Sequence, residues 1–174
     1  MTCHSDIGKI HSLFIKNVQQ AFINDAHIDK QWKELNYLWK PALDEAIAEY
    51  SSFEKSFTSQ GAHIFYFPED ASVNMDSLYC RDAAIATDGG IILCNMGKAG
   101  RSLEPQAQQK AYEANGFKIL GAITAPGTLE GGDVAWLDQH TLAVGHTYRT
   151  NPEGILQLTA LLKPLGVDVI TVPL

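Results

Sequence analysis

The sequence is poor in cysteine and in positive charge, and each shortage excludes a class of protein. Its three cysteines, Cys3, Cys80 and Cys94, have neither the number nor the spacing of a disulfide framework or a structural zinc site. We therefore expect reduced thiols and no metal. Lysine and arginine together number 13 against 20 acidic residues, and the net charge of -7 repels phosphate backbones. Nucleic acid is not an expected partner.

Long hydrophobic runs are also absent. Near the start, Lys9, His11 and Lys16 interrupt a short apolar run, and no stretch approaches the roughly 20 residues of a membrane span. The sequence therefore predicts a cytoplasmic protein without a membrane partner. A hydrophobic content of 45% over 174 residues is typical of a folded globular domain.

The first 70 residues predict an irregular module, a helix followed by a strand. Gly61 ends the predicted helix, and the β-branched and aromatic run 63–67, closed by Pro68, predicts a buried strand. The helix is predicted from apolar residues at helical spacing: Leu43, Ala46, Ile47, Tyr50, Phe53 and Phe57.

Residues 74–122 predict a regular α/β module. A hairpin of residues 83–87 and 91–96 turns at Asp88-Gly89-Gly90, because these residues tolerate positive φ. A helix over 103–114 and a strand over 117–122 follow. The predicted order is strand, strand, helix, strand.

Residues 130–174 predict the same order again. Strands over 133–137 and 141–144 form a hairpin, Asn151 caps a helix that begins with Pro152, and a strand covers 167–172. The apolar face of this helix is predicted to comprise Leu156, Leu161 and Leu162.

Polar residues repeat with the modules at an offset of 48 residues. The offset superposes Asp82 on Glu130 and Arg101 on Arg149. Repeats of this period indicate a radial or stacked architecture, in which equivalent loops gather around one centre. Residues 1–174 would then form a single incomplete domain, and the two acids and two arginines would face a common cavity.

Such a cavity suits a free amino acid with a guanidino side chain. A carboxylate matches the donor fork of a guanidinium, and an arginine matches an α-carboxylate for the same reason. The alternative is that these charges are solvated turn residues of a structural α/β domain.

Four segments resemble, in order and spacing, a family of guanidino-group-modifying enzymes: the dimethylargininases, arginine deiminases and amidinotransferases. The resemblance implies a pentein-type α/β propeller of five blades, of which roughly three lie in this chain, with Gly8–Lys16 as the opening strand. The segments are residues 74–82, 100–104, 129–134 and 144–151.

The resemblance also implies roles for single residues, without a metal or organic cofactor. Asp82 would bind the guanidinium, Asp76 the α-amino group, and Arg101 and Arg149 the α-carboxylate. Glu130 would orient a catalytic histidine and share in guanidinium binding. Arg81 stands where dimethylargininases tend to carry an acid, which leaves the exact substrate open.

In the family's mechanism a cysteine thiolate attacks the guanidinium carbon and a histidine transfers protons. Both residues follow the segment that ends here at Leu174, so we expect them beyond it. Cys94, in a predicted strand, is expected in the core. Cys80 is expected on the same strand face as Asp82, and His140 and His146 at the surface.

The resulting hypothesis is a dimethylargininase- or amidinotransferase-like protein that acts on arginine or a methylated arginine. The alternative is a non-catalytic module that binds an arginine-like ligand, or an inactive truncated form. Open sheet edges would favour a homo-oligomer or pairing with a missing C-terminal half.

Overall fold

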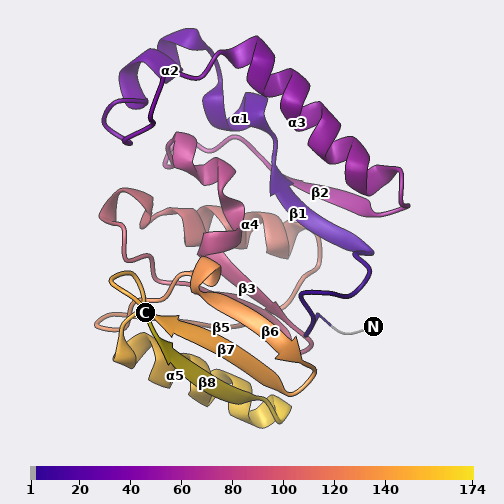
Figure 1. The fold of residues 1–174 in the computed structure, drawn as a ribbon, viewed down its shortest axis with the longest axis vertical. Helices are drawn as coiled ribbons and strands as arrows, with labels where there is room; N and C mark the ends of the chain where they lie inside the picture. Colours follow the sequence, from indigo (N-terminus) through magenta and orange to yellow (C-terminus); the bar gives the residue numbers. More distant parts are fainter. Residues whose placement is uncertain (1–2) are drawn as a thin grey trace. The chain divides into compact units, whose positions relative to one another are not determined.

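The computed structural model describes residues 3–174, which divide into two compact units (Figure 1). One unit comprises Lys9–Cys80, and the other comprises residues 3–8 together with Arg81–Leu174. Each unit has its own hydrophobic core.

The unit Lys9–Cys80 contains a two-stranded parallel sheet and three helices. Strands β1 (Ser12–Lys16) and β2 (His63–Phe67) pair in register. Helices α1 (Val18–Phe22) and α2 (Asp25–Gln31) supply most of the core. Helix α3 (Leu43–Thr58) confirms the predicted helix, and its Leu43, Ala46, Ile47 and Tyr50 pack against that core.

Two predictions for this unit need correction. Strand β2 was expected to be buried, but only Phe67 is, and Tyr66 is exposed. The reason is that β2 lies in a sheet of only two strands. Phe53, predicted on the apolar face of α3, is also exposed. No residue of α3 is fully buried.

The second unit contains the two predicted modules, and both have the expected order (Figure 1). In the first, β3 (Ala84–Thr87) and β4 (Gly90–Leu93) form an antiparallel hairpin, and β5 (Ile119–Ala122) pairs parallel to β4 after helix α4 (Glu104–Ala114). In the second, β6 (Val134–Asp138) and β7 (Thr141–His146) form the hairpin, and β8 (Asp168–Pro173) pairs parallel to β7 after helix α5 (Pro152–Leu162).

Local sequence explains where these elements begin and turn. Gly90 has a φ of +133°, and a Cβ there would lie 2.6 Å from the carbonyl oxygen of Lys118. Asn151 caps α5 as predicted, since its Oδ1 accepts a hydrogen bond of 2.8 Å from the Gly154 amide. The described part of the chain, residues 3–174, also contains five short 3-10 helices: η1 (Met75–Leu78), η2 (Cys80–Ala83), η3 (Ala99–Arg101), η4 (Gly131–Asp133) and η5 (Lys163–Leu165).

The apolar face of α5 was predicted only in part. Leu162 is buried and Leu161 packs against the core, but Leu156 is 63% exposed. The phase of the helix instead buries Ile155 and Leu158. Both sheets contribute to this core, which includes Ile85, Ile92, Leu129, Val134, Leu142 and Val144.

The α/β architecture and the module order are therefore confirmed, whereas the five-bladed ring stays a prediction. Within residues 3–174, no helix is both long enough and apolar enough to cross a membrane.

Candidate functional site

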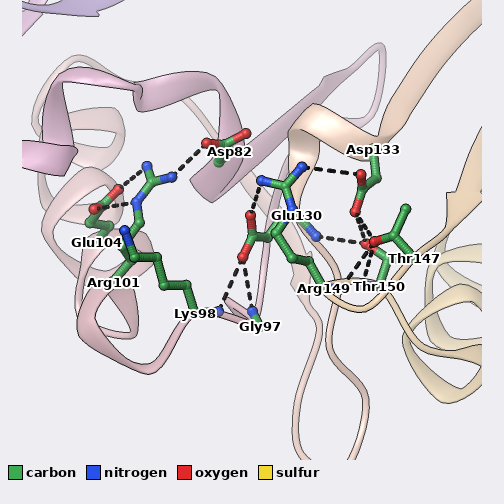
Figure 2. A network of polar contacts seen from close by, with 10 residues as sticks. All are labelled: Asp82, Gly97, Lys98, Arg101, Glu104, Glu130, Asp133, Thr147, Arg149 and Thr150. Atoms are coloured by element: carbon green, nitrogen blue, oxygen red, sulfur yellow. Dashed lines mark hydrogen bonds and ion pairs between the residues drawn. The ribbon is translucent and has the colours of Figure 1, made fainter. Parts of the chain in front are cut away.

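The first module holds a cluster of three charged side chains (Figure 2). Asp82 lies in η2 and Arg101 at the end of η3, and Arg101 Nη1 donates to Asp82 Oδ2 at 2.6 Å. Glu104, at the start of α4, accepts from Arg101 Nε at 2.8 Å and from Nη2 at 2.7 Å. The side chains of Arg101 and Glu104 are 5% and 2% exposed, and that of Asp82 is 17% exposed.

The two carboxylates stabilise the charge of this buried arginine. Burial alone would lower the pKa of Arg101, but the hydrogen bonds and negative charges of Glu104 and Asp82 raise it. Arg101 therefore remains a cation inside the protein.

The second module holds the matching cluster (Figure 2). Glu130 Oε2 accepts from Arg149 Nη1 at 2.8 Å, and Arg149 Nη2 lies 3.3 Å from Asp133 Oδ1. Here the acid is the buried partner, with Glu130 1% exposed and Arg149 29% exposed. Burial tends to lower the pKa of Arg149, but the negative charges of Glu130 and Asp133 raise it.

Asp133 also fixes the loop that carries Arg149. Its Oδ2 accepts from Thr147 Oγ1 at 2.9 Å and from Thr150 Oγ1 at 2.6 Å. Thr147 Oγ1 in turn accepts from the Arg149 amide at 3.0 Å. The position of Arg149 is therefore fixed by a hydrogen bond from its backbone amide as well as by the ion pairs of its side chain.

Glu130 connects the two modules. Its Oε1 accepts from the amides of Gly97 and Lys98, in the loop after the first hairpin, at 3.1 and 3.2 Å. Next to it, the Leu129 amide donates to the Asn95 carbonyl at 2.9 Å. The second acid thus helps to shape the loop that leads to Arg101.

Glycines allow the two clusters to approach. Gly131 and Gly132 do not have positive φ, so they are not here to permit a left-handed turn. A Cβ at Gly132 would lie 2.3 Å from Asp82 Oδ1, and one at Gly131 would lie 2.3 Å from the Arg81 carbonyl oxygen. Glycine is needed at both positions because the segment containing Asp82 packs directly against Gly131 and Gly132.

The structure thus brings Asp82, Arg101, Glu130 and Arg149 into two clusters, in which each acid pairs with the arginine of its own module. The fifth predicted site residue, Asp76, belongs to the other unit, where it is buried in η1 and its amide donates to Asn74 Oδ1 at 2.9 Å.

The alternative nucleophiles and histidines can also be placed. The predicted strand face shared by Cys80 and Asp82 is wrong, because both residues lie in η2 rather than in a strand. Cys94 is in the core as predicted, and burial raises the pKa of its thiol. His140 and His146 are exposed as expected.

Four residues of the clusters were given no role by sequence reasoning. Glu104 and Asp133 each stand three residues after a predicted site residue, and this spacing was the available signal. Thr147 and Thr150 flank Arg149, but their bonds to Asp133 require the fold to be known. Within residues 3–174, no group of three or more histidine, cysteine or acidic side chains is placed to hold a metal ion.

Comparison with known proteins identifies similar sequences. The family model of arginine deiminase matches residues 73–166. The N(G),N(G)-dimethylarginine dimethylaminohydrolase of Streptomyces coelicolor is 34% identical over 98 residues, which cover 56% of this chain and 37% of that protein. The protein of the same name from Pseudomonas aeruginosa is 26% identical over 133 residues, covering 76% of this chain and 52% of that protein. The chain therefore spans about half, or less, of the length of these relatives.

Solved structures show the same α/β fold. A dimethylarginine dimethylaminohydrolase from P. aeruginosa in complex with citrulline has a TM-score of 0.76 at 21% identity, covering 96% of this chain and 62% of that one. The N-terminal domain of a cyanobacterial arginine dihydrolase, bound to substrate, has a TM-score of 0.74 at 15% identity, covering 94% and 58%. An amidinotransferase from Microseira wollei has a TM-score of 0.66 at 16% identity, covering 94% and 59%.

Proposed function

The chain belongs to the arginine deiminase family, and from this premise we propose that it acts on the guanidino group of arginine or a methylated arginine. The relatives named above are hydrolases and an amidinotransferase, so the proposed reaction is hydrolysis or amidino transfer. The ligand would be a small molecule with a positive guanidinium at one end and an amino acid backbone at the other.

One observation supports the proposal most strongly. Each module places a carboxylate in hydrogen-bond contact with a guanidinium, at 2.6 Å for Asp82 and 2.8 Å for Glu130. These acids therefore have positions and surroundings that suit a guanidinium. Within residues 3–174, Asp82 Oδ1 accepts no hydrogen bond, and this oxygen could accept one from a ligand.

The remaining roles follow the family resemblance. Asp76 would bind the ligand's α-amino group, the two arginines would supply positive charge for its α-carboxylate, and Glu130 would orient a catalytic histidine. The proposed contribution of this chain to catalysis is therefore to position the ligand, which converts an encounter in solution into a reaction between aligned groups.

The proposed chemistry needs a thiolate and an imidazole. The thiolate attacks the guanidinium carbon, and the amine leaves with a proton from the histidine. Water then attacks the same carbon, the histidine accepts its proton, and the C–S bond breaks to give a urea product and the free thiolate. In amidino transfer an acceptor amine takes the place of water. The cysteine and histidine are proposed to lie beyond Leu174, in a protein that completes a five-bladed ring.

Two measurements test the proposal. Isothermal titration calorimetry on this chain should detect saturable binding of L-arginine, which Asp82→Asn abolishes. The matched control is Asp138→Asn, an exposed acid at the end of strand β6, and it should bind as the wild type does. If the wild-type chain binds neither L-arginine nor N(G),N(G)-dimethylarginine, the proposal is wrong.

The second measurement separates catalysis from binding alone. The native gene product is incubated with each ligand, and citrulline and ornithine are quantified. Citrulline indicates hydrolysis, and ornithine formed only with an acceptor amine indicates transfer. Binding without either product would assign the protein as a ligand-binding module.

A further inference from the structure

The segment near the start of the chain binds to both hairpins of the second unit, although they are distant in sequence. His4 is 4% exposed, and its ring connects the two hairpin turns. The Asp88 amide, between β3 and β4, donates to His4 Nε2 at 3.0 Å. Nδ1 donates to the Gln139 carbonyl, between β6 and β7, at 2.9 Å. Because one nitrogen accepts and the other donates, the bound imidazole is the neutral ring with its proton on Nδ1.

The second hairpin also supplies an aromatic surface for this ring. His4 and Trp136 of β6 stack with their ring centroids 3.9 Å apart and an angle of 8° between their planes. The Cys3 amide adds a hydrogen bond of 2.6 Å to Asp88 Oδ1. His4 is therefore recognised by the flat face of its ring and by both of its nitrogens.

Asp6 forms the second anchor of the segment. Strand β6 lies at the edge of its three-stranded sheet, and the amides of an edge strand can bind groups outside the sheet. The Trp136 amide donates to Asp6 Oδ2, and Arg81 Nη2 lies 3.4 Å from Asp6 Oδ1. Arg81 Nη2 also donates to the Val134 carbonyl at 2.9 Å. The carboxylate of Asp6 thus binds an edge amide and a cation at the same time.

The segment occupies the space between the hairpins without filling it. Residues 7–11, which follow the two anchors, are exposed. A segment that is held by a few directed bonds beside a cavity resembles a bound ligand more than a part of a close-packed core. The cavity has a volume of about 110 Å³, and its lining includes Ser5, Asp6, Arg81, Ala84, Ala86 and Trp136.

We propose that the two hairpin turns and strand β6 form a peptide-binding groove, and that residues 3–6 are its tethered ligand. The groove takes a short peptide with an imidazole side chain followed, two residues later, by a carboxylate. Binding of the segment ties the turns of the two modules together. This inference does not depend on the proposed function, because it rests on the hairpin turns and not on the charged clusters.

The groove is tested by offering it the same peptide as a separate molecule. A peptide of residues 3–8 with a fluorescent label at its C-terminal end is titrated into the 174-residue chain carrying His4→Ala and Asp6→Ala, and anisotropy is measured. The tethered segment then lacks both recognised side chains while the groove is unchanged, so we expect saturable binding. The wild-type chain should bind at least about tenfold more weakly, because its own segment competes at a high effective concentration.

Two controls test whether the imidazole and the carboxylate are recognised. A peptide in which alanine replaces both the histidine and the aspartate should bind neither chain. Adding Trp136→Leu to the double variant should weaken the peptide about tenfold, whereas Trp136→Phe, which keeps an aromatic ring, should weaken it less. Equal binding of the two peptides, or equal binding by the wild type and the double variant, would overturn the proposal.

A thermal melt by circular dichroism is run on each variant. If the double variant lacks a cooperative transition, Asp6→Asn, which keeps the volume of the side chain, replaces it. The peptide should then bind about threefold or more tightly to this variant than to the wild type, since the tethered segment has lost its charge-assisted bonds. A folded variant, double or single, that binds the peptide no better than the wild type does would contradict the tethered-ligand role.

Discussion

Helices α4 and α5 hold the same place in their modules but bury different kinds of side chain. Helix α5 adds Ile155, Leu158 and Leu162 to the shared core, whereas α4 buries the polar Glu104 and Gln108 in addition to Pro105, Ala111 and Tyr112. Burial of a charged group is very costly unless the group is paired, and Glu104 is paired with Arg101. The helix of the second module thus contributes mainly to the core, and the helix of the first module also supports the charged cluster through Glu104.

The largest expected effect compares the two acids. Glu130→Ala should destabilise the chain by about 4 kcal/mol, because it removes a buried partner from Arg149 and from two backbone amides. Asp82→Ala should cost about 1–2 kcal/mol, since Asp82 is partly exposed and Arg101 keeps Glu104. Urea denaturation measures both. Equal losses of unfolding free energy would contradict this expected difference between Glu130 and Asp82.

The core of α5 supplies the next comparison. Leu158→Ala should lower the free energy of unfolding by about 3 kcal/mol, because its side chain is fully buried and a cavity would remain. Leu156→Ala, on the same helix, should change it by less than about 0.5 kcal/mol, because that side chain is exposed. A large effect at Leu156 would indicate that it lies in an interface.

These two leucines also show what the sequence could and could not predict. Turn residues and the repeat gave the order of elements in both modules, because such signals are local. Which face of α5 is buried depends on how the helix packs on β7 and β8. This packing determines that Leu158 is buried and that Leu156 is exposed. The exposure of β2 depends likewise on how many strands its sheet contains.

The functional site shows the same distinction between features that are visible in the sequence and features that depend on tertiary packing. Asp82, Arg101, Glu130 and Arg149 were found from the offset of 48 residues, because a repeat is visible in sequence alone. Their pairing was not predicted, since it depends on side-chain direction and on Glu104, for which the second module has Pro152 at the same offset. Asp133 supplies the second carboxylate there from a different element.

A smaller effect is expected from two glycines related by the same offset. Gly97→Ala should destabilise by about 2 kcal/mol, because its Cβ would lie 2.7 Å from the Arg149 backbone. Gly145→Ala should cost less than about 1 kcal/mol, because its nearest contact, at 2.9 Å, is the end of the exposed Leu174 side chain. Thermal melts of both variants test the difference, and a costlier Gly145→Ala would mean that the second loop is the tighter one.

The smallest effect concerns how the two helices begin. Asn151 Oδ1 accepts from the Gly154 amide at 2.8 Å and from the Thr128 amide at 3.1 Å, whereas Leu103 at the start of α4 makes no side-chain cap. Asn151→Ala should therefore cost about 1 kcal/mol, and Leu103→Ala less than about 0.5 kcal/mol. Asn151→Asp should recover most of the loss in urea denaturation, because its carboxylate keeps the acceptor and favours the positive end of the helix dipole. If Asn151→Asp is no more stable than Asn151→Ala, the contribution of Asn151 comes instead from its Nδ2, which donates to the Pro126 carbonyl at 2.9 Å.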